Sequence, residues 1–193
     1  MARRSMMQTQ RGSRKLWQLS IPDIIVIAVI AAISRVINMI GIMLPLPTPI
    51  GEWWFIMQFS FLFCVTAAIV RKPFTVIIFT LIQLLVNLLF FGGSPIWAMQ
   101  NIGQGVIAEI AIIAVWFSSG HYMDNWWSVI IGGLVDGIAA FAIGFGIIMP
   151  VFFATVLPAD VLAIAGAGFV IAGPVMGLLG FRTGKAIKPL IGK

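Results

Sequence analysis

The chain has 193 residues, of which 61% are hydrophobic and 9% are charged. A soluble domain carries roughly 25% charged residues, so this composition excludes a water-soluble globular protein and indicates an integral membrane protein. The net charge of +6 comes mainly from basic residues between and beside apolar runs. Such residues attract anionic lipid and give no support for nucleic acid binding.

Six apolar runs follow one another along the chain, each close to the roughly 20 residues that a membrane-crossing helix needs. Because the runs are continuous and do not alternate, they predict α-helices and not a β-barrel. We expect a basic tail at 1–17, a membrane domain at 18–185 and a C-terminal tail at 186–193. The predicted fold class is all-α, a polytopic bundle of six transmembrane helices at about 21–44, 53–70, 73–91, 97–118, 127–154 and 160–181.

The basic residues predict how this bundle is oriented. The loops near 45–52, 92–96 and 155–159 contain none, whereas the opposite side holds five in the tail, then Arg71, Lys72, Arg182, Lys185, Lys188 and Lys193. Cytoplasmic loops carry the excess of lysine and arginine in membrane proteins. Both termini are therefore expected in the cytoplasm, and the protein in the cell membrane.

The remaining basic residue, Arg35, falls inside the first span. A charge at that depth costs a few kcal/mol or more unless it faces the bundle or a cavity and has a partner. The acids within spans are Glu109 and Asp136, and Glu109 is the better partner on depth. The pair is either a structural link between two helices or part of a ligand site, and the sequence leaves both open.

Amides and tryptophans add to this polar group. Asn101, Gln104 and Glu109 share one broad face of the fourth span. The tryptophans of the outer interface form either an aromatic belt or a stacking surface for a flat ring. The predicted substrate site comprises Glu109, Gln104, Asn101, Trp53, Trp54, Trp97, Arg35, Asn38, Gln83 and Asn87.

Other chemistry is disfavoured. Cys64 is the single cysteine and lies in a span, which excludes a disulfide, and the chain has a single histidine. We therefore expect no metal site and no cofactor. The sequence contains no phosphate-binding loop and no nucleophilic triad in its spans, so it predicts a protein that is not an enzyme.

Small residues give one more pattern, with Ala28 and Ala32 four apart on the first span. Such spacing lets helices approach closely. It fits packing inside the bundle or a docking face for another membrane protein.

Two further short motifs are Arg71-Lys72-Pro73 between the second and third spans and Gln104-Gly105-Val106-Ile107-Ala108-Glu109 in the fourth. With these motifs and the alanine face, the chain resembles the substrate-binding S components of energy-coupling factor (ECF) vitamin transporters. The likeness covers most of 17–185 and is nearest to the YkoE-type subfamily, associated with thiamine or its hydroxymethylpyrimidine precursor. Residues 46–49 and the outer fifth span depart from it.

The resemblance implies a subunit that captures a vitamin from outside and then associates with a transmembrane coupling subunit and two cytoplasmic ATPases. Ala28 and Ala32 would contact the coupling subunit, and the partners would hydrolyse ATP. Two other classes remain open. One is a self-sufficient secondary transporter or channel that uses Arg35, Glu109 and Asp136. The other is a structural membrane subunit.

Overall fold

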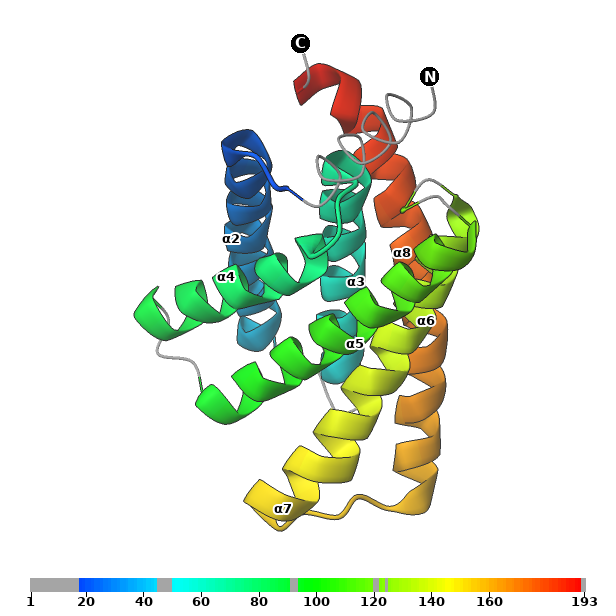
Figure 1. Ribbon diagram of the computed structural model, residues 1–193. Helices are drawn as coiled ribbons and strands as arrows, with labels where there is room; N and C mark the ends of the chain where they lie inside the picture. Colours follow the sequence, from blue (N-terminus) through cyan, green and yellow to red (C-terminus); the bar gives the residue numbers. More distant parts are fainter. Residues whose placement is uncertain (1–17, 45–49, 91–93, 120–121, 124, 192–193) are drawn as a thin grey trace, which may run out of the picture.

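The computed structural model describes residues 18–44, 50–90, 94–119, 122–123 and 125–191, so the predicted tail at 1–17 lies outside the described residues. The described chain is a bundle of helices, shown in Figure 1. Five of them are long and apolar enough to cross a membrane, and one apolar helix is shorter. The elements are α2 (Ile21–Met43), α3 (Ile50–Val70), α4 (Thr75–Phe90), α5 (Pro95–Ser119), α6 (Trp126–Ile143), η1 (Gly144–Ile148), α7 (Met149–Phe153) and α8 (Ala159–Ile191). The all-helical, multi-pass membrane fold predicted from the sequence is confirmed.

The first helix begins where the sequence provides a cap. The Ser20 side chain accepts from the Asp23 amide, and the Asp23 carboxylate accepts from the Ser20 amide, which forms a capping box. Lys72 Nζ lies 2.6 Å from the same carboxylate. The segment after α3 is therefore joined to the start of α2.

The third predicted span, 73–91, is shorter in the structure. Pro73 precedes the helix, and Phe74 has a φ of 67°, a left-handed conformation that a helix cannot contain. The helix α4 starts at Thr75 and has 16 residues, less than the roughly 20 needed to cross a bilayer upright. Figure 1 shows α4 and α5 crossing α2 and α3 at a steep angle.

The fifth predicted span, 127–154, is one long helix with a π-helical turn inside it. The turn η1 covers Gly144–Ile148, directly before Met149 and Pro150. A proline has no amide hydrogen and its ring collides with the carbonyl four residues earlier. A π-turn widens the helix at such a place, which lets α6 continue through η1 into α7.

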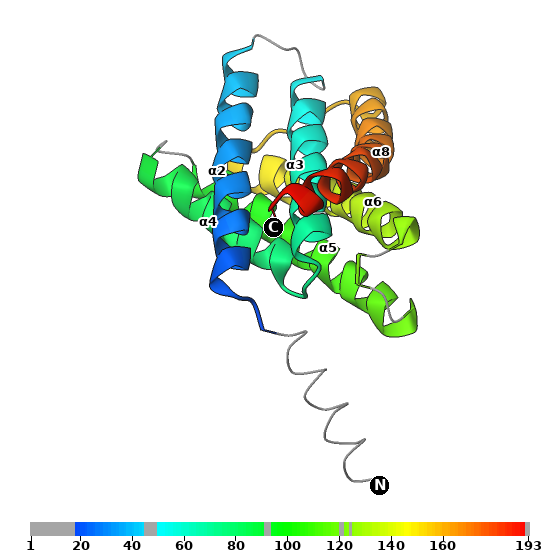
Figure 2. The ribbon, with the colours of Figure 1, turned by 90° about the horizontal axis from the view of Figure 1, so that it is seen from above.

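The helix α3 forms the centre of the bundle. It is buried along most of its length and lies between α2 and α8, as Figure 2 shows. Glycines bring α6 and α8 together: a Cβ on Gly133 would meet the Gly173 carbonyl, and a Cβ on Gly137 would meet the Phe169 carbonyl. The small residues of the last two spans thus serve packing within the bundle.

The start of α2 and the ends of α3 and α8 lie at the same end of the molecule (Figure 1). This arrangement puts Arg71, Lys72 and Lys185 at one end, as the topology prediction requires. The helix α8 continues to Ile191, past the predicted end of its span at 181. Exposed isoleucines, leucines and valines cover the outer faces of the helices, which is the surface that lipid contacts.

Candidate functional site

A polar cavity of about 330 Å³ opens between α2, α3, α4 and α5. It lies where α2 ends and α3 begins, away from Arg71 and Lys72 at the other end of α3. Ala140 of α6 and Phe169 of α8 complete its wall. A cavity of this size suits a small ligand. Its lining comprises Arg35, Asn38, Ile42, Glu52, Phe55, Ile56, Gln58, Phe59, Asn87, Ser94, Trp97, Gln100, Asn101, Gln104, Ala140 and Phe169.

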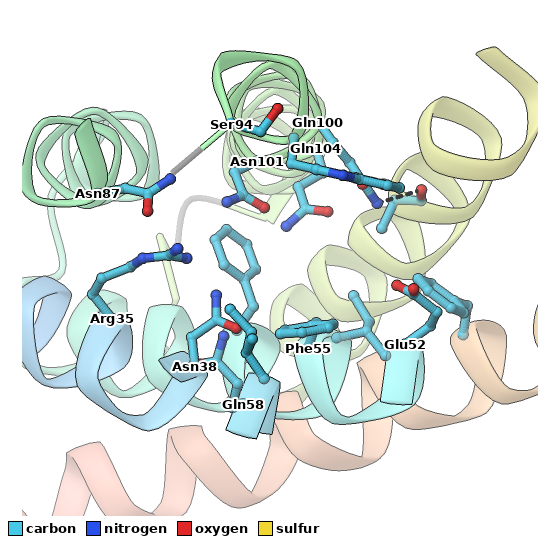
Figure 3. Close-up of a pocket in the computed structure, with 16 residues that line it drawn as sticks. Arg35, Asn38, Glu52, Phe55, Gln58, Asn87, Ser94, Gln100, Asn101 and Gln104 are labelled. Carbon is cyan, nitrogen blue, oxygen red and sulfur yellow. Dashed lines mark hydrogen bonds between the residues drawn. The ribbon is translucent and has the colours of Figure 1, made fainter. Parts of the chain in front are cut away.

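The cavity brings together six of the side chains predicted from the sequence to form a site: Arg35, Asn38, Asn87, Trp97, Asn101 and Gln104. Figure 3 shows Arg35 and Asn38 on α2 facing Asn87 on α4, with Asn101 and Gln104 above them on α5. Arg35, Asn38 and Asn87 are 7%, 6% and 5% exposed. These polar groups are therefore nearly withdrawn from solvent yet border a space that a ligand could fill.

Glu109 does not line the cavity, and the predicted pairing of Glu109 with Arg35 is wrong. Its carboxylate accepts from the amides of Phe74 at 2.9 Å and Val76 at 2.7 Å, and from the Tyr122 hydroxyl at 2.6 Å. The prediction treated α5 as upright, whereas α5 is steeply inclined. Glu109 also lies eight residues beyond Asn101, which is about 12 Å along the helix.

Glu109 instead holds the start of α4. The carboxylate is fully buried and accepts hydrogen bonds from backbone amides at the N-terminus of α4, which have no partner within the helix. A negative charge is favoured at a helix N-terminus. Burial raises the pKa of Tyr122 above its usual value, and the nearby Glu109 carboxylate raises it further. The phenol therefore stays neutral and donates to Glu109 over the physiological pH range.

Two predicted tryptophans and one glutamine also lie outside the cavity lining. The indole of Trp53 donates to the Ala165 carbonyl at 3.3 Å and packs on Gly168 of α8. Trp54 packs on Gly41 of α2. Gln83 donates to the Ser34 hydroxyl at 2.5 Å. These side chains join neighbouring helices, whereas Trp97 borders the cavity and stacks on Phe153 with ring centres 5.7 Å apart.

The structure adds lining residues that the sequence prediction omitted, mainly Glu52, Gln58, Ser94 and Gln100. The sequence pattern of α3 could have indicated its lining residues, because positions 52, 55, 56, 58 and 59 share one face of the helix. Gln100 adjoins Asn101 and was left out of the predicted site, whereas the structure places both in the cavity lining. Its Nε2 donates to the Ala140 carbonyl at 2.9 Å.

The polar groups of the cavity are incompletely paired. Arg35 Nε, Asn38 Oδ1 and Asn87 Oδ1 are buried and have no hydrogen-bond partner among the described residues. In the part of the chain that the structure describes, no carboxylate forms an ion pair with Arg35. Buried polar groups in proteins are nearly always paired, so these groups mark a place prepared for a ligand or for water.

The remaining predicted residues have separate surroundings. Asp136 is fully buried outside the cavity, with its Oδ2 2.5 Å from the Ser60 hydroxyl. No three potential metal ligands gather within the described ranges. Ala28 and Ala32 are half-buried on α2.

No protein-family model matches this chain, and no curated protein matches it either. Among solved structures, the chain is similar to a protein described as "Crystal structure of an S-component of ECF transporter". The TM-score is 0.62 at 20% sequence identity, over 90% of this chain and 86% of that one. Likeness at this identity concerns the fold. The chain therefore has the fold of an ECF transporter S component, with a polar cavity inside it.

Proposed function

We propose that this chain is the membrane-embedded, substrate-binding subunit of an ECF-type importer and is not itself an enzyme. The observation that carries this proposal is the polar cavity inside an apolar bundle with the S-component fold. Intramembrane charges such as Arg35 are costly and usually mark a ligand or ion pathway. A binding site for a small molecule accounts for both the cavity and its unpaired groups.

The proposed orientation places the cavity on the outer side of the membrane. Eleven basic residues lie in the tail, at Arg71 and Lys72, and after residue 181, and the positive-inside rule assigns these segments to the cytoplasm. The cavity lies toward the other end of α3. A ligand would thus enter from outside, as uptake requires.

The resemblance noted above favours thiamine or its hydroxymethylpyrimidine precursor as the ligand. Since Glu109 is engaged elsewhere, we assign its expected role to Glu52, the carboxylate of the cavity lining. A carboxylate accepts from an exocyclic amine and pairs with a protonated ring nitrogen. Trp97 is the tryptophan positioned to stack on the ring, with Asn101 and Gln104 beside it.

The proposed partners are a transmembrane coupling subunit and two cytoplasmic ATPases. The half-buried Ala28 and Ala32 form the proposed docking face on α2. Isoleucines and valines exposed around them, Ile25, Val29 and Ile33, would be covered by the partner or by lipid. This assignment rests on the resemblance and on the packing that small residues allow.

Ligand binding by the isolated chain tests the proposal. The chain should bind a vitamin or vitamin precursor when purified alone, and proteoliposomes that hold it alone should show no uptake. Uptake should appear when the coupling subunit and ATPases are added with ATP. Flux through the chain alone would instead support a secondary transporter or channel, for which Arg35, Glu109 and Asp136 were the candidate relay.

A further inference from the structure

The guanidinium of Arg35 is a buried charge that lacks a protein counterion. Arg35 is 7% exposed, lies inside a membrane-length helix, and forms no ion pair with any described residue. Its Nε is also unpaired. An unpaired cation is unfavourable in a membrane interior, and an anion placed beside it would give the charge a partner.

The hydrogen-bond network beside Arg35 adds a second donor. Gln83 Nε2 donates to the Ser34 hydroxyl at 2.5 Å, and that hydroxyl donates to Gln58 Oε1 at 2.9 Å. When the hydrogen bonds run from Gln83 through Ser34 to Gln58, one amide oxygen of Gln83 stays unpaired. If they ran from Gln58 through Ser34 to Gln83, the buried NH₂ of Gln83 would lack an acceptor, which is less favourable. The Gln58 NH₂ is therefore free to donate into the cavity near Arg35.

The opposite end of the cavity presents acceptors. Gln100 uses its Nε2 to bond the Ala140 carbonyl, so its Oε1 is left to accept. Glu52 supplies the carboxylate of this end, and Figure 3 shows both side chains on the side away from Arg35. The cavity thus has a cationic end, where Arg35 and the donor of Gln58 lie beside the unpaired oxygens of Asn38 and Asn87, and an acidic end at Glu52 and Gln100.

The distance between the two ends follows from α3. The Ser34–Gln58 bond puts Arg35, the residue after Ser34, at the level of Gln58. Glu52 lies six residues earlier on the same helix, which is about 9 Å at 1.5 Å per residue. A single heterocycle with a short substituent, or two linked rings, reaches across such a space.

We propose that the cavity selects an amphoteric ligand, with one anionic group bound by Arg35 and Gln58 and a cationic or amine-bearing group bound by Glu52 and Gln100. This inference rests on the substrate-binding role proposed above and specifies the charges of its substrate. Thiamine and hydroxymethylpyrimidine carry no anionic group, so the expected ligand becomes a relative of theirs that carries one. Arg35 is the one cation among the described lining residues, so the anionic end carries a single carboxylate or a single phosphate group.

Two measurements test this inference on the purified full-length chain. Mass spectrometry of the co-purifying small molecule should find one anionic group together with an amine or a cationic ring. Matched pairs should then be titrated while tryptophan fluorescence is followed: thiamine monophosphate against thiamine, and an aminopyrimidine carboxylate against hydroxymethylpyrimidine. The anionic member of at least one pair should bind roughly ten- to a hundredfold more tightly, the size of a charge-assisted bond.

Variants separate the two ends. Arg35→Gln should abolish the preference for the anionic member of a pair, and Arg35→Lys should retain part of that preference. Glu52→Gln should weaken both members of a pair equally. Monodisperse elution of each variant confirms that it is folded.

The failures are distinguishable. Tight binding of thiamine or hydroxymethylpyrimidine with no preference for the anion, or a preference that survives Arg35→Gln, would overturn the inference and leave the proposed function intact. A co-purifying ligand without an anionic group would do the same. If no small molecule co-purifies and no compound of either pair binds, the proposed function fails and this inference fails with it.

Discussion

Replacing Glu109 distinguishes a structural residue from a ligand residue. In Glu109→Gln, one carboxylate oxygen becomes an NH₂ group that faces a donor, either the amide of Phe74 or Val76 or the Tyr122 hydroxyl. Losing a charge-assisted bond costs about 1.5–3 kcal/mol, and leaving a buried donor unpaired costs about 1–3 kcal/mol more. We expect the variant to be destabilised by roughly 3–5 kcal/mol, with ligand affinity unchanged below its melting temperature.

The single cysteine provides the assay for this prediction. Cys64 is fully buried, so a thiol-reactive fluorogenic dye reports unfolding of the detergent-solubilised protein. At about 2–4 °C per kcal/mol for a chain of this length, Glu109→Gln should melt about 10 °C lower than wild type. Tyr122→Phe removes one of the bonds and should show a smaller shift in the same direction.

A cavity variant provides the matched control. Gln104→Ala changes a lining residue, so it should lower ligand affinity and shift the melting temperature less than Glu109→Gln does. A Glu109→Gln protein that melts with the wild type and has lost its ligand affinity would refute this reasoning. It would restore Glu109 to the binding site predicted from the sequence.

The other predictions concern topology, docking and packing. In a cysteine-free background, a cysteine in place of Thr48 should be labelled from outside the cell and one in place of Gly120 should not, and the opposite sidedness would reverse the orientation. Ala32→Trp should abolish uptake and spare ligand binding in the isolated chain; joint loss would place Ala32 in the internal core. Gly133→Ala should lower the melting temperature because its Cβ meets the Gly173 carbonyl, whereas Gly146→Ala, which meets nothing within 4 Å, should be neutral. Equal melting of these two variants would contradict the close α6–α8 contact.

The helices were accessible from the sequence because each depends on local chemistry. The first span was predicted at 21–44 and is Ile21–Met43. Its start could be predicted because the apolar run and the Ser20 cap before it are both local features of the sequence. The late start of α4 was harder to predict from the sequence, because it depends on the positive φ of Phe74 after Pro73. Propensity alone does not place that boundary.

The site was only partly predictable because it depends on helix tilt. Helical spacing identifies which side chains share a face, and it grouped Asn101 with Gln104 correctly. It does not say how far along an inclined helix that face stays against the cavity, so Glu109 was included and Glu52 was missed. Gln58 and Gln83 are both buried amides joined through Ser34, and the sequence alone does not show that Gln58 is the one that lines the cavity.

The short, inclined α4 has a consequence for the surrounding lipid. Its 16 residues extend about 24 Å, less than the roughly 30 Å of a hydrocarbon core, and the tilt reduces its vertical reach further. Leu81, Leu85 and Leu89 are exposed along it, so acyl chains cover this flank. The bilayer must thin on that side and can keep its full thickness beside the longer α8, a mismatch that costs a fraction of a kcal/mol per Å. The hydrophobic length of the protein is thus shorter on the α4 side than on the α8 side. A bilayer of short-chain lipids should need less elastic deformation around the protein than a bilayer of long-chain lipids.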